Sequence, residues 1–166
     1  MKKIYKLIIS LLIPQLAGGI GGIFTASSVG GWYKTLNRGS LNPPGWVFGP
    51  VWTALFLLMG YALYIVWTSE NVKDKKKAYW IFGIQLALNT FWSIIFFGFQ
   101  NPGLAFFEIW ILWAAILANI IVFYRINRWA GYLLLPYLGW VSFAIYLNYS
   151  IWRLNDYVSS LYPPLF

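Results

Sequence analysis

Charged residues divide the chain into long uncharged segments. These segments are residues 7–33, 39–69, 78–107, 109–124 and 129–152. A helix needs about 20 mostly apolar residues to cross a bilayer. The pattern therefore predicts five membrane-spanning helices, at about residues 5–27, 46–68, 79–99, 104–124 and 131–153. The segment 78–107 holds one span and the start of the next, because Gln100-Asn101-Pro102-Gly103 is a turn signal.

The apolar stretches are continuous and show no alternation, for example in residues 81–99 and 104–124. A membrane β-barrel would alternate apolar and polar positions in short segments. An open sheet cannot span lipid, because its backbone groups would be left unpaired. The sequence thus predicts an all-α integral membrane protein, a five-helix bundle that forms a single domain over residues 1–166.

The composition supports the membrane class and excludes several kinds of chemistry. Of the 166 residues, 60% are hydrophobic and 10% are charged, against roughly 25% charged in a soluble domain. The mean hydropathy is +0.65. The chain has no Cys and no His, which removes disulfides, the usual zinc sites, Ser-His triads and the commonest haem ligands. We expect no bound metal and no resident cofactor.

Lysine and arginine predict the orientation in the membrane. With five spans, the N-terminus, second loop and fourth loop share one side and carry Lys2, Lys3, Lys6, Lys73, Lys75, Lys76, Lys77, Arg125 and Arg128. The other side carries Lys34, Arg38 and Arg153. The positive-inside rule places the N-terminus in the cytoplasm. Charges on short loops do not form a nucleic-acid surface. The Lys-, Ile- and Asn-rich composition suggests a bacterial cell membrane.

The first span has an alternative interpretation as a signal peptide. Lys2 and Lys3 precede the apolar residues 8–13, as in such a leader. No A-x-A-like cleavage site follows, and the apolar stretch continues through Ile23 and Phe24. A retained membrane span is therefore favoured.

Residues 28–45 form a long connection between the first two spans. They are rich in aromatic residues, Gly and Pro and poor in charge. Long ordered loops of this kind often serve as lids or binding loops. We expect a lid over one end of the bundle, with a plain surface linker as the alternative.

Aromatic residues make up 22% of the chain, including 11 Trp. Many of them lie at helical spacing together with the few polar residues inside the spans. These stripes are Phe48, Trp52, Leu55, Phe56 and Met59; Gln85, Asn89, Trp92, Ser93 and Phe96; and Trp140, Phe143, Ala144, Leu147 and Asn148. Such faces suit a cavity for a flat, mostly apolar ligand. The alternative is that the amides only hydrogen-bond between helices.

Glu108 is the only acid within a predicted span. A lone acid there could bind a cation or couple to protons. It could equally extend to the interface or pair with an arginine of the same side. The second, structural interpretation is favoured.

Small residues four apart mark close helix packing. The pairs are Gly18 and Gly22, Gly83 and Ala87, and Ala114 and Ala118. For the first pair, packing within one chain is favoured. We expect a homodimer that forms through such small-residue helix faces.

Several sequence blocks are distinctive in combination. They are Trp32-Tyr33, Asn42-Pro43-Pro44-Gly45-Trp46-Val47-Phe48-Gly49-Pro50-Val51-Trp52-Thr53, Gln85-Leu86-Ala87-Leu88-Asn89 with Trp92, Pro136-Tyr137-Leu138-Gly139-Trp140, and Leu147-Asn148-Tyr149-Ser150-Ile151-Trp152-Arg153-Leu154-Asn155. Over nearly the whole chain the sequence resembles the TspO/MBR family, the translocator or peripheral-type benzodiazepine receptor proteins. One departure is Arg38-Gly39 in the first loop, where many relatives have Lys-Pro; a looser lid is the expected effect.

The resemblance implies a five-helix bundle, usually dimeric, with a cavity that opens towards the first loop. Family members bind porphyrins, benzodiazepine-type and isoquinoline carboxamide drugs and, in animals, cholesterol. Carried over by position, the ligand-binding residues would be Tyr33, Pro43, Phe48, Trp52, Phe56, Asn89, Trp92, Trp140, Phe143, Ala144 and Leu147.

Three functions follow as expectations. The first is binding of protoporphyrin IX and drug-like aromatic molecules, in tetrapyrrole sensing or handling. The second is light- and oxygen-dependent degradation of porphyrin, in which Trp52 and Trp140 would be the catalytic residues. The third is transport of porphyrin or lipid, which the lack of an inverted repeat disfavours.

Overall fold

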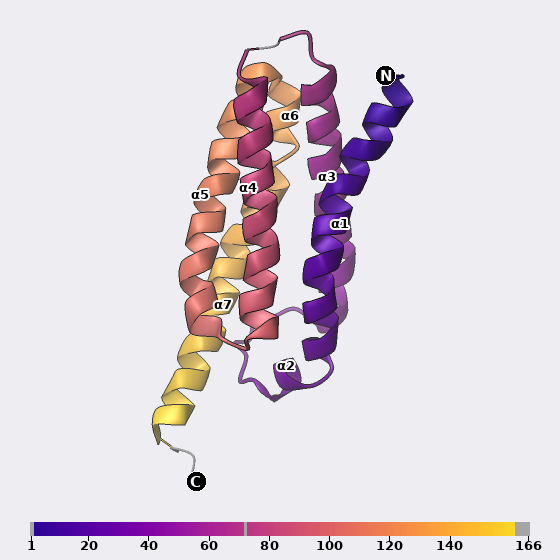
Figure 1. Ribbon diagram of the computed structural model, residues 1–166. Coiled ribbons are helices and arrows are strands. Elements are labelled where there is room, and N and C mark those ends of the chain that lie inside the picture. The colour runs from indigo at the N-terminus through magenta and orange to yellow at the C-terminus, as the bar shows by residue number, and fades with distance from the viewer. Residues whose placement is uncertain (1, 72, 162–166) are drawn as a thin grey trace.

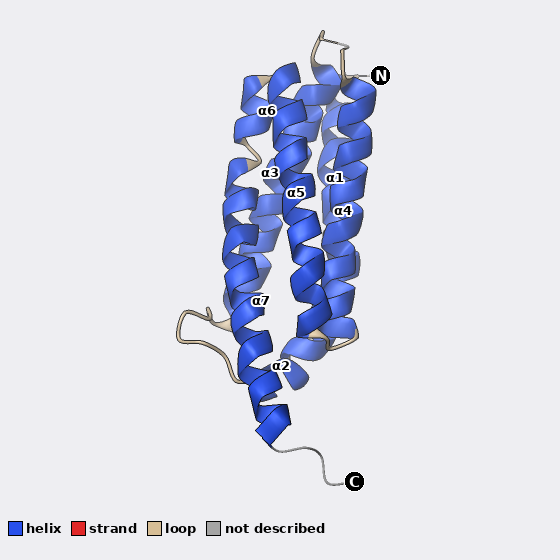
Figure 2. Cartoon of the chain, turned by 90° about the vertical axis from the view of Figure 1, so that its left-hand side faces the viewer, coloured by secondary structure: helices blue, strands red, loops and turns tan. Residues whose placement is uncertain are grey.

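The computed structural model describes residues 2–71 and 73–161, with side chains as far as Asp156. The described residues form helices and no strand (Figures 1 and 2). The long helices are α1 (Lys3–Val29), α3 (Phe48–Thr68), α4 (Lys75–Ser93), α5 (Pro102–Ile126) and α7 (Leu135–Leu161). Five helical segments are long and apolar enough to cross a membrane. The predicted bundle is confirmed.

The fifth span differs from the single helix expected over residues 131–153. A short helix α6 (Arg128–Tyr132) ends before α7 begins at Leu135. Pro136 explains the break, because proline has no N–H to donate and its ring clashes with the carbonyl four residues earlier. Asn127 caps α6 by accepting a hydrogen bond from the Trp129 N–H at 2.9 Å.

The third span ends in a wider helical turn. After α4 the chain continues as a π-helix, η2 (Ile94–Gly98), which the apolar pattern does not predict. The expected turn follows, with Gln100 in the left-handed region at φ 53°. The Asn101 side chain then accepts a hydrogen bond from the Leu104 N–H at 2.9 Å, and Pro102 is the first residue of α5.

Helix α1 packs on α3 and α4, while α5 packs on α4 and α7 (Figure 1). Helices α1 and α3 approach each other closely at Gly60, where a Cβ atom would lie 2.7 Å from the Leu11 Cα and the Ser10 carbonyl oxygen. That carbonyl has lost its helical partner, because Pro14 has no N–H. Glycine is therefore required at position 60. Around this level Met59, Ala62 and Val66 are completely buried.

The first loop lies at the end of the bundle away from the N-terminus, as the lid interpretation predicts (Figure 2). It contains a short helix, α2 (Trp32–Thr35), and a 3-10 turn, η1 (Gly45–Val47). The Asn37 N–H donates to the Asn155 Oδ1 at 3.1 Å, and the Asn155 Nδ2 donates to the Asn37 carbonyl at 3.0 Å. A Cβ atom at Gly39 would lie 2.7 Å from the Ser150 Oγ. Glycine therefore lets the loop approach α7 closely.

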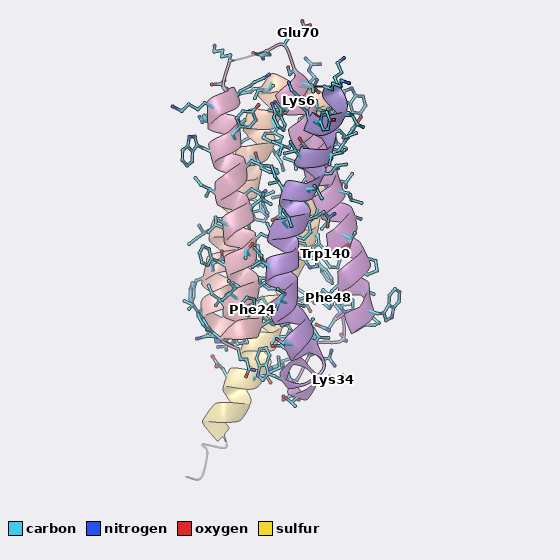
Figure 3. All side chains as sticks on the ribbon, turned by 45° about the vertical axis from the view of Figure 1, so that its right-hand side comes forward. Lys6, Phe24, Lys34, Phe48, Glu70 and Trp140 are labelled. Atoms are coloured by element: carbon cyan, nitrogen blue, oxygen red, sulfur yellow. The ribbon has the colours of Figure 1, made fainter. Side chains whose placement is uncertain are left out.

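Charged residues lie at both ends of the bundle. Lys6 and Glu70 lie at the end that holds the N-terminus, and Lys34 lies at the lid end (Figure 3). The basic N-terminal segment and the loop between α3 and α4 share one end (Figure 1). This arrangement matches the topology from which the orientation was inferred, and the orientation itself stays a prediction.

The small-residue pairs have different surroundings. Gly18 lies against Phe56, where an added Cβ atom would overlap the ring, so this glycine packs within the chain as expected. Gly83 and Ala87 are exposed on the outer face of α4. Their use as a dimer face stays a prediction.

Candidate functional site

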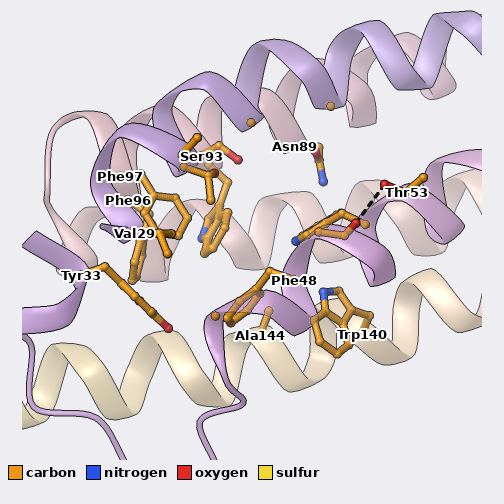
Figure 4. A pocket seen from close by; sticks show the side chains of 18 of the residues that line it. Val29, Tyr33, Phe48, Thr53, Asn89, Ser93, Phe96, Phe97, Trp140 and Ala144 are labelled. Carbon is orange, nitrogen blue, oxygen red and sulfur yellow. Dashed lines mark hydrogen bonds between the residues drawn. The ribbon is translucent and has the colours of Figure 1, made fainter. Parts of the chain in front are cut away.

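A cavity of about 450 Å³ lies in the lid-end half of the bundle (Figure 4). Its walls come from α1, α3, α4 with η2, and α7, and α2 contributes Tyr33 at the lid end. Helix α5 contributes none of the lining residues. The volume falls in the range of about 300–1,000 Å³ that small-molecule sites occupy.

Aromatic rings form the wall between α3 and α7. The Trp52 ring stacks on Phe56 at 5.5 Å between centroids and meets the Tyr137 ring edge-on at 6.2 Å. Phe48 meets Trp140 edge-on at 6.2 Å. These contacts hold the rings in fixed positions, so a flat ligand can stack on them without reordering the wall.

Tyr33 closes the cavity at the lid end. Its side chain is only 3% exposed and contacts Phe96 and Phe97 at 6.3 and 5.7 Å between ring centroids. The hydroxyl donates to the Asn42 Oδ1 at 3.1 Å. The Arg38 guanidinium lies over the same ring at 5.1 Å, a cation–π contact. The loop thus positions Tyr33 from two sides.

The amides on the wall form hydrogen bonds between helices and also line the cavity. The Asn89 Nδ2 donates to the Tyr137 hydroxyl at 2.9 Å. The Trp92 indole N–H donates to the Asn148 Oδ1 at 3.1 Å, and the Asn148 Nδ2 donates to the Pro102 carbonyl at 2.6 Å. Asn89 and Trp140 point into the cavity from opposite sides (Figure 4).

Two indole N–H groups on the wall have no protein acceptor. Among the described residues, neither Trp52 nor Trp140 donates a hydrogen bond. Figure 4 shows the Trp140 nitrogen on the cavity side of its ring. Because an indole nitrogen can only donate, a ligand that carries acceptor atoms can bind to both groups.

Gln85 and Glu108 lie outside the cavity wall. The Gln85 Nε2 donates to the Met59 sulfur at 3.6 Å in the packed half of the bundle. Both Glu108 carboxylate oxygens are buried and have no hydrogen-bond partner among the described residues. Neither the expected extension to the interface nor the expected pairing with an arginine is therefore seen.

The structure brings nine of the eleven expected ligand-binding residues together around the cavity: Tyr33, Phe48, Trp52, Phe56, Asn89, Trp92, Trp140, Ala144 and Leu147. Pro43 and Phe143 are the exceptions. Pro43 belongs to the loop outside Tyr33, and its carbonyl accepts from the Asn42 Nδ2 at 3.1 Å. Phe143 packs on the Trp140 ring at 5.8 Å from outside. Ligand contact by the nine residues stays a prediction.

Sequence reasoning missed the α1 wall. Gly22, Thr25 and Ala26 line the cavity, and so do Phe97 and Ile151 on other helices. Gly22 is the second member of the pair interpreted as helix packing, yet an added Cβ atom there would meet nothing within 4 Å. The spacing of three and four residues between Gly22, Thr25 and Ala26 places them on one face of α1, and this spacing was the signal available in the sequence.

All the lining residues are uncharged. The described residues hold no group of three or more His, Cys, Asp or Glu that could bind a metal ion. The arrangement can stack a flat ligand between rings and donate hydrogen bonds to it. It offers no pair of acidic side chains on the wall for acid–base chemistry.

Comparison with known proteins identifies the family. The TspO/MBR family profile matches residues 10–153. "Tryptophan-rich protein TspO" of Archaeoglobus fulgidus is 44% identical over 153 residues, 92% of this chain and 98% of the relative. The protein of the same name from Chlorobaculum tepidum is 41% identical over 155 residues, 93% and 98% of the two chains. The human "Translocator protein" is 39% identical over 147 residues, 87% and 86%. The chain therefore belongs to the TspO/MBR family of integral membrane proteins.

Proposed function

We propose that the protein binds porphyrins such as protoporphyrin IX, and other flat aromatic molecules, and acts in tetrapyrrole sensing or handling. One observation carries the proposal. The cavity is uncharged and aromatic, and it presents two unpaired indole N–H groups, on Trp52 and Trp140. A macrocycle with an apolar face and acceptor atoms satisfies both properties.

The apolar cavity and the basic residues near the lid together favour a ligand with an apolar body and an anionic edge. Each Å² of apolar surface removed from water contributes about 25 cal/mol, and the rings add stacking contacts. Carboxylates cannot be buried in an uncharged cavity without a partner. We therefore place them towards the lid, where Lys34 and Arg38 lie.

We further propose that the N-terminus faces the cytoplasm of a bacterial cell. The support is the excess of Lys and Arg at the end of the bundle that holds Lys6 (Figure 3). Basic residues in short loops are retained on the cytoplasmic side.

The test is a dark titration of the purified protein in lipid nanodiscs with protoporphyrin IX. Trp52→Phe and Trp140→Phe keep an aromatic ring at each position and remove the N–H group. We expect saturable binding that each variant weakens by about 2–12-fold, as the loss of one hydrogen bond predicts. Trp80→Phe is the matched control, because Trp80 is 67% exposed on the outer face of α4. No saturable binding, or equal weakening in all three variants, would contradict the proposal.

Light-dependent degradation of the porphyrin is a second candidate, because Trp52 and Trp140 line the same cavity. An indole beside an excited porphyrin can be oxidised, and so the same samples are illuminated in air and the products are analysed by mass spectrometry. One defined product that is lost in Trp52→Phe or Trp140→Phe indicates an enzyme. Scattered products that neither variant changes indicate photosensitised damage to a binding protein.

A further inference from the structure

The seam between α1 and α3 is closed beside the packed half of the bundle. Leu11 lies against the backbone of Gly60, and Gly18 lies against the Phe56 ring. The Gln15 Nε2 also donates to the Thr53 carbonyl at 3.3 Å, across the seam. Towards the lid the two segments meet again, where the Val29 Cγ1 lies 3.5 Å from the Cβ position of Gly45.

Between these two closures, small residues border the seam. Gly19, Gly22 and Ala26 of α1 and Gly49 of α3 border it; all four are exposed and also line the cavity. A Cβ atom added at any of these three glycines would meet nothing within 4 Å. Helix α1 rises about 10 Å over the seven steps from Gly19 to Ala26. We call the gap bordered by these four residues the side window.

The side window lies at the depth of the lipid tails. Gly22 is sixteen residues after Lys6 and seven before Val29, the last residue of α1, which is about 24 Å and 10 Å along the helix. Next to the window, Leu16, Ile20 and Ile23 are exposed on the outer face of α1. Large apolar side chains of this kind face lipid tails rather than headgroups.

The lid end is covered more firmly. Asn37 is bonded to Asn155 in both directions. Tyr33 is 3% exposed and bonded to Asn42. A ligand that used this end would have to break these contacts, whereas the side window presents only glycine and alanine. Flat apolar molecules also concentrate in the bilayer, so the window faces the phase that holds them.

We propose that the cavity opens sideways into the bilayer through the side window, and that flat apolar ligands enter and leave there. In the absence of ligand, lipid acyl chains reach the cavity wall by the same route. The passage of ligands rests on the proposed binding function, and the access of acyl chains does not.

Acyl-chain access is tested with the full-length protein in vesicles of phosphatidylcholine that carries a diazirine near the end of one chain. After irradiation, mass spectrometry locates the labelled residues. We expect label on Asn89 and Leu147, which line the cavity and are 5% and 7% exposed. Gly22→Leu should reduce that label about tenfold by blocking the window. Gly83→Leu is the matched control, because Gly83 has equally open surroundings on α4 but lies outside the cavity.

Ligand passage is tested by stopped-flow mixing with vesicles preloaded with protoporphyrin IX. A blocked window lowers the association and dissociation rates of Gly22→Leu together, by about tenfold each. A leucine that merely fills part of the cavity would raise the dissociation rate instead, so the direction of that rate separates the two effects. Asn155→Ala, which loosens the lid, should leave both rates unchanged.

The outcomes separate this proposal from the proposed function. Absence of label on Asn89 and Leu147, or faster exchange in Asn155→Ala with no effect of Gly22→Leu, overturns the side window and leaves porphyrin binding intact. Absence of saturable porphyrin binding in the unaltered protein overturns the binding function, and the acyl-chain label still decides whether the window is open.

Discussion

The two halves of the bundle differ in what lies between α1 and α3, although both use glycine there. In the packed half, Gly60 brings the α3 backbone against Leu11, and Met59 and Ala62 are completely buried beside it. In the hollow half, Gly22 of α1 faces an empty volume. The difference arises because the Trp52 ring stacks on Phe56 and contacts the Tyr137 ring of α7 edge-on. The Trp52 side chain therefore leaves space next to α1. A glycine closes a seam only where the facing residue fills it.

The largest expected effect is that of Gly60→Leu. The new side chain meets the Leu11 Cα and the Ser10 carbonyl, which are backbone atoms that cannot move aside. We expect a loss of about 3 kcal/mol or more in the free energy of unfolding. Gly22→Ala should be neutral or slightly stabilising, because nothing lies within 4 Å and alanine favours helix. SDS-induced unfolding in mixed micelles measures both, and equal losses would show that the two halves do not differ in packing.

An intermediate effect comes from truncating one leucine in each half. Leu112 is 1% exposed in the packed core, and Leu147 lines the cavity. We expect Leu112→Ala to cost about 2–5 kcal/mol of unfolding free energy, the range for a core leucine. Leu147→Ala should cost about 1–2 kcal/mol less, because part of its side chain already borders empty volume and lacks contacts there. The same unfolding measurement applies. A larger loss of unfolding free energy in Leu147→Ala than in Leu112→Ala would show that the hollow half is packed more tightly than the geometry indicates.

The smallest expected effect is at the lid. Asn155→Ala removes both hydrogen bonds to Asn37 and should cost about 1 kcal/mol, since the loop is exposed to water. Hydrogen exchange of the Asn37 amide should become faster, while exchange around Met59 should stay unchanged. Asn155→Asp keeps the acceptor for the Asn37 N–H and serves as the control. Unaltered exchange in Asn155→Ala would mean that other contacts hold the lid.

The spans could be predicted because charged side chains are costly in lipid and therefore rare there, so gaps between charges mark the helices. Finer features depend on geometry. Pro136 is a sequence signal for the break between α6 and α7. The hydropathy pattern hides this signal, because Leu133 and Leu134 are apolar and continue the predicted span. The π-helix at Ile94–Gly98 has no such signal, since its residues suit an α-helix equally well. In the structure, Phe96 and Phe97 of this segment pack around the Tyr33 ring.

The site was predicted less completely, and the reasons are again specific. Residues three and four apart both share a helix face with Trp140, but they diverge to opposite sides by about 60° and 40°. Ala144 therefore faces the cavity, whereas Phe143 packs on the edge of Trp140. Glycine gives no indication of its neighbour, so Gly18 and Gly22 look alike in sequence although one packs on Phe56 and the other faces the cavity. The contacts of a loop residue such as Pro43 depend on how the loop folds.

The exclusion of α5 from the cavity wall has a consequence for how this chain can vary. Its hydrogen bond with the wall, which the Asn148 Nδ2 donates to the Pro102 carbonyl, uses a backbone acceptor and does not depend on which side chains α5 carries. Changes at exposed positions of α5, such as Phe107 and Ile111, can therefore tune how the protein tolerates temperature or membrane composition while ligand choice stays constant. Changes on α7 alter recognition directly, so the two traits lie on separate helices and can be selected independently.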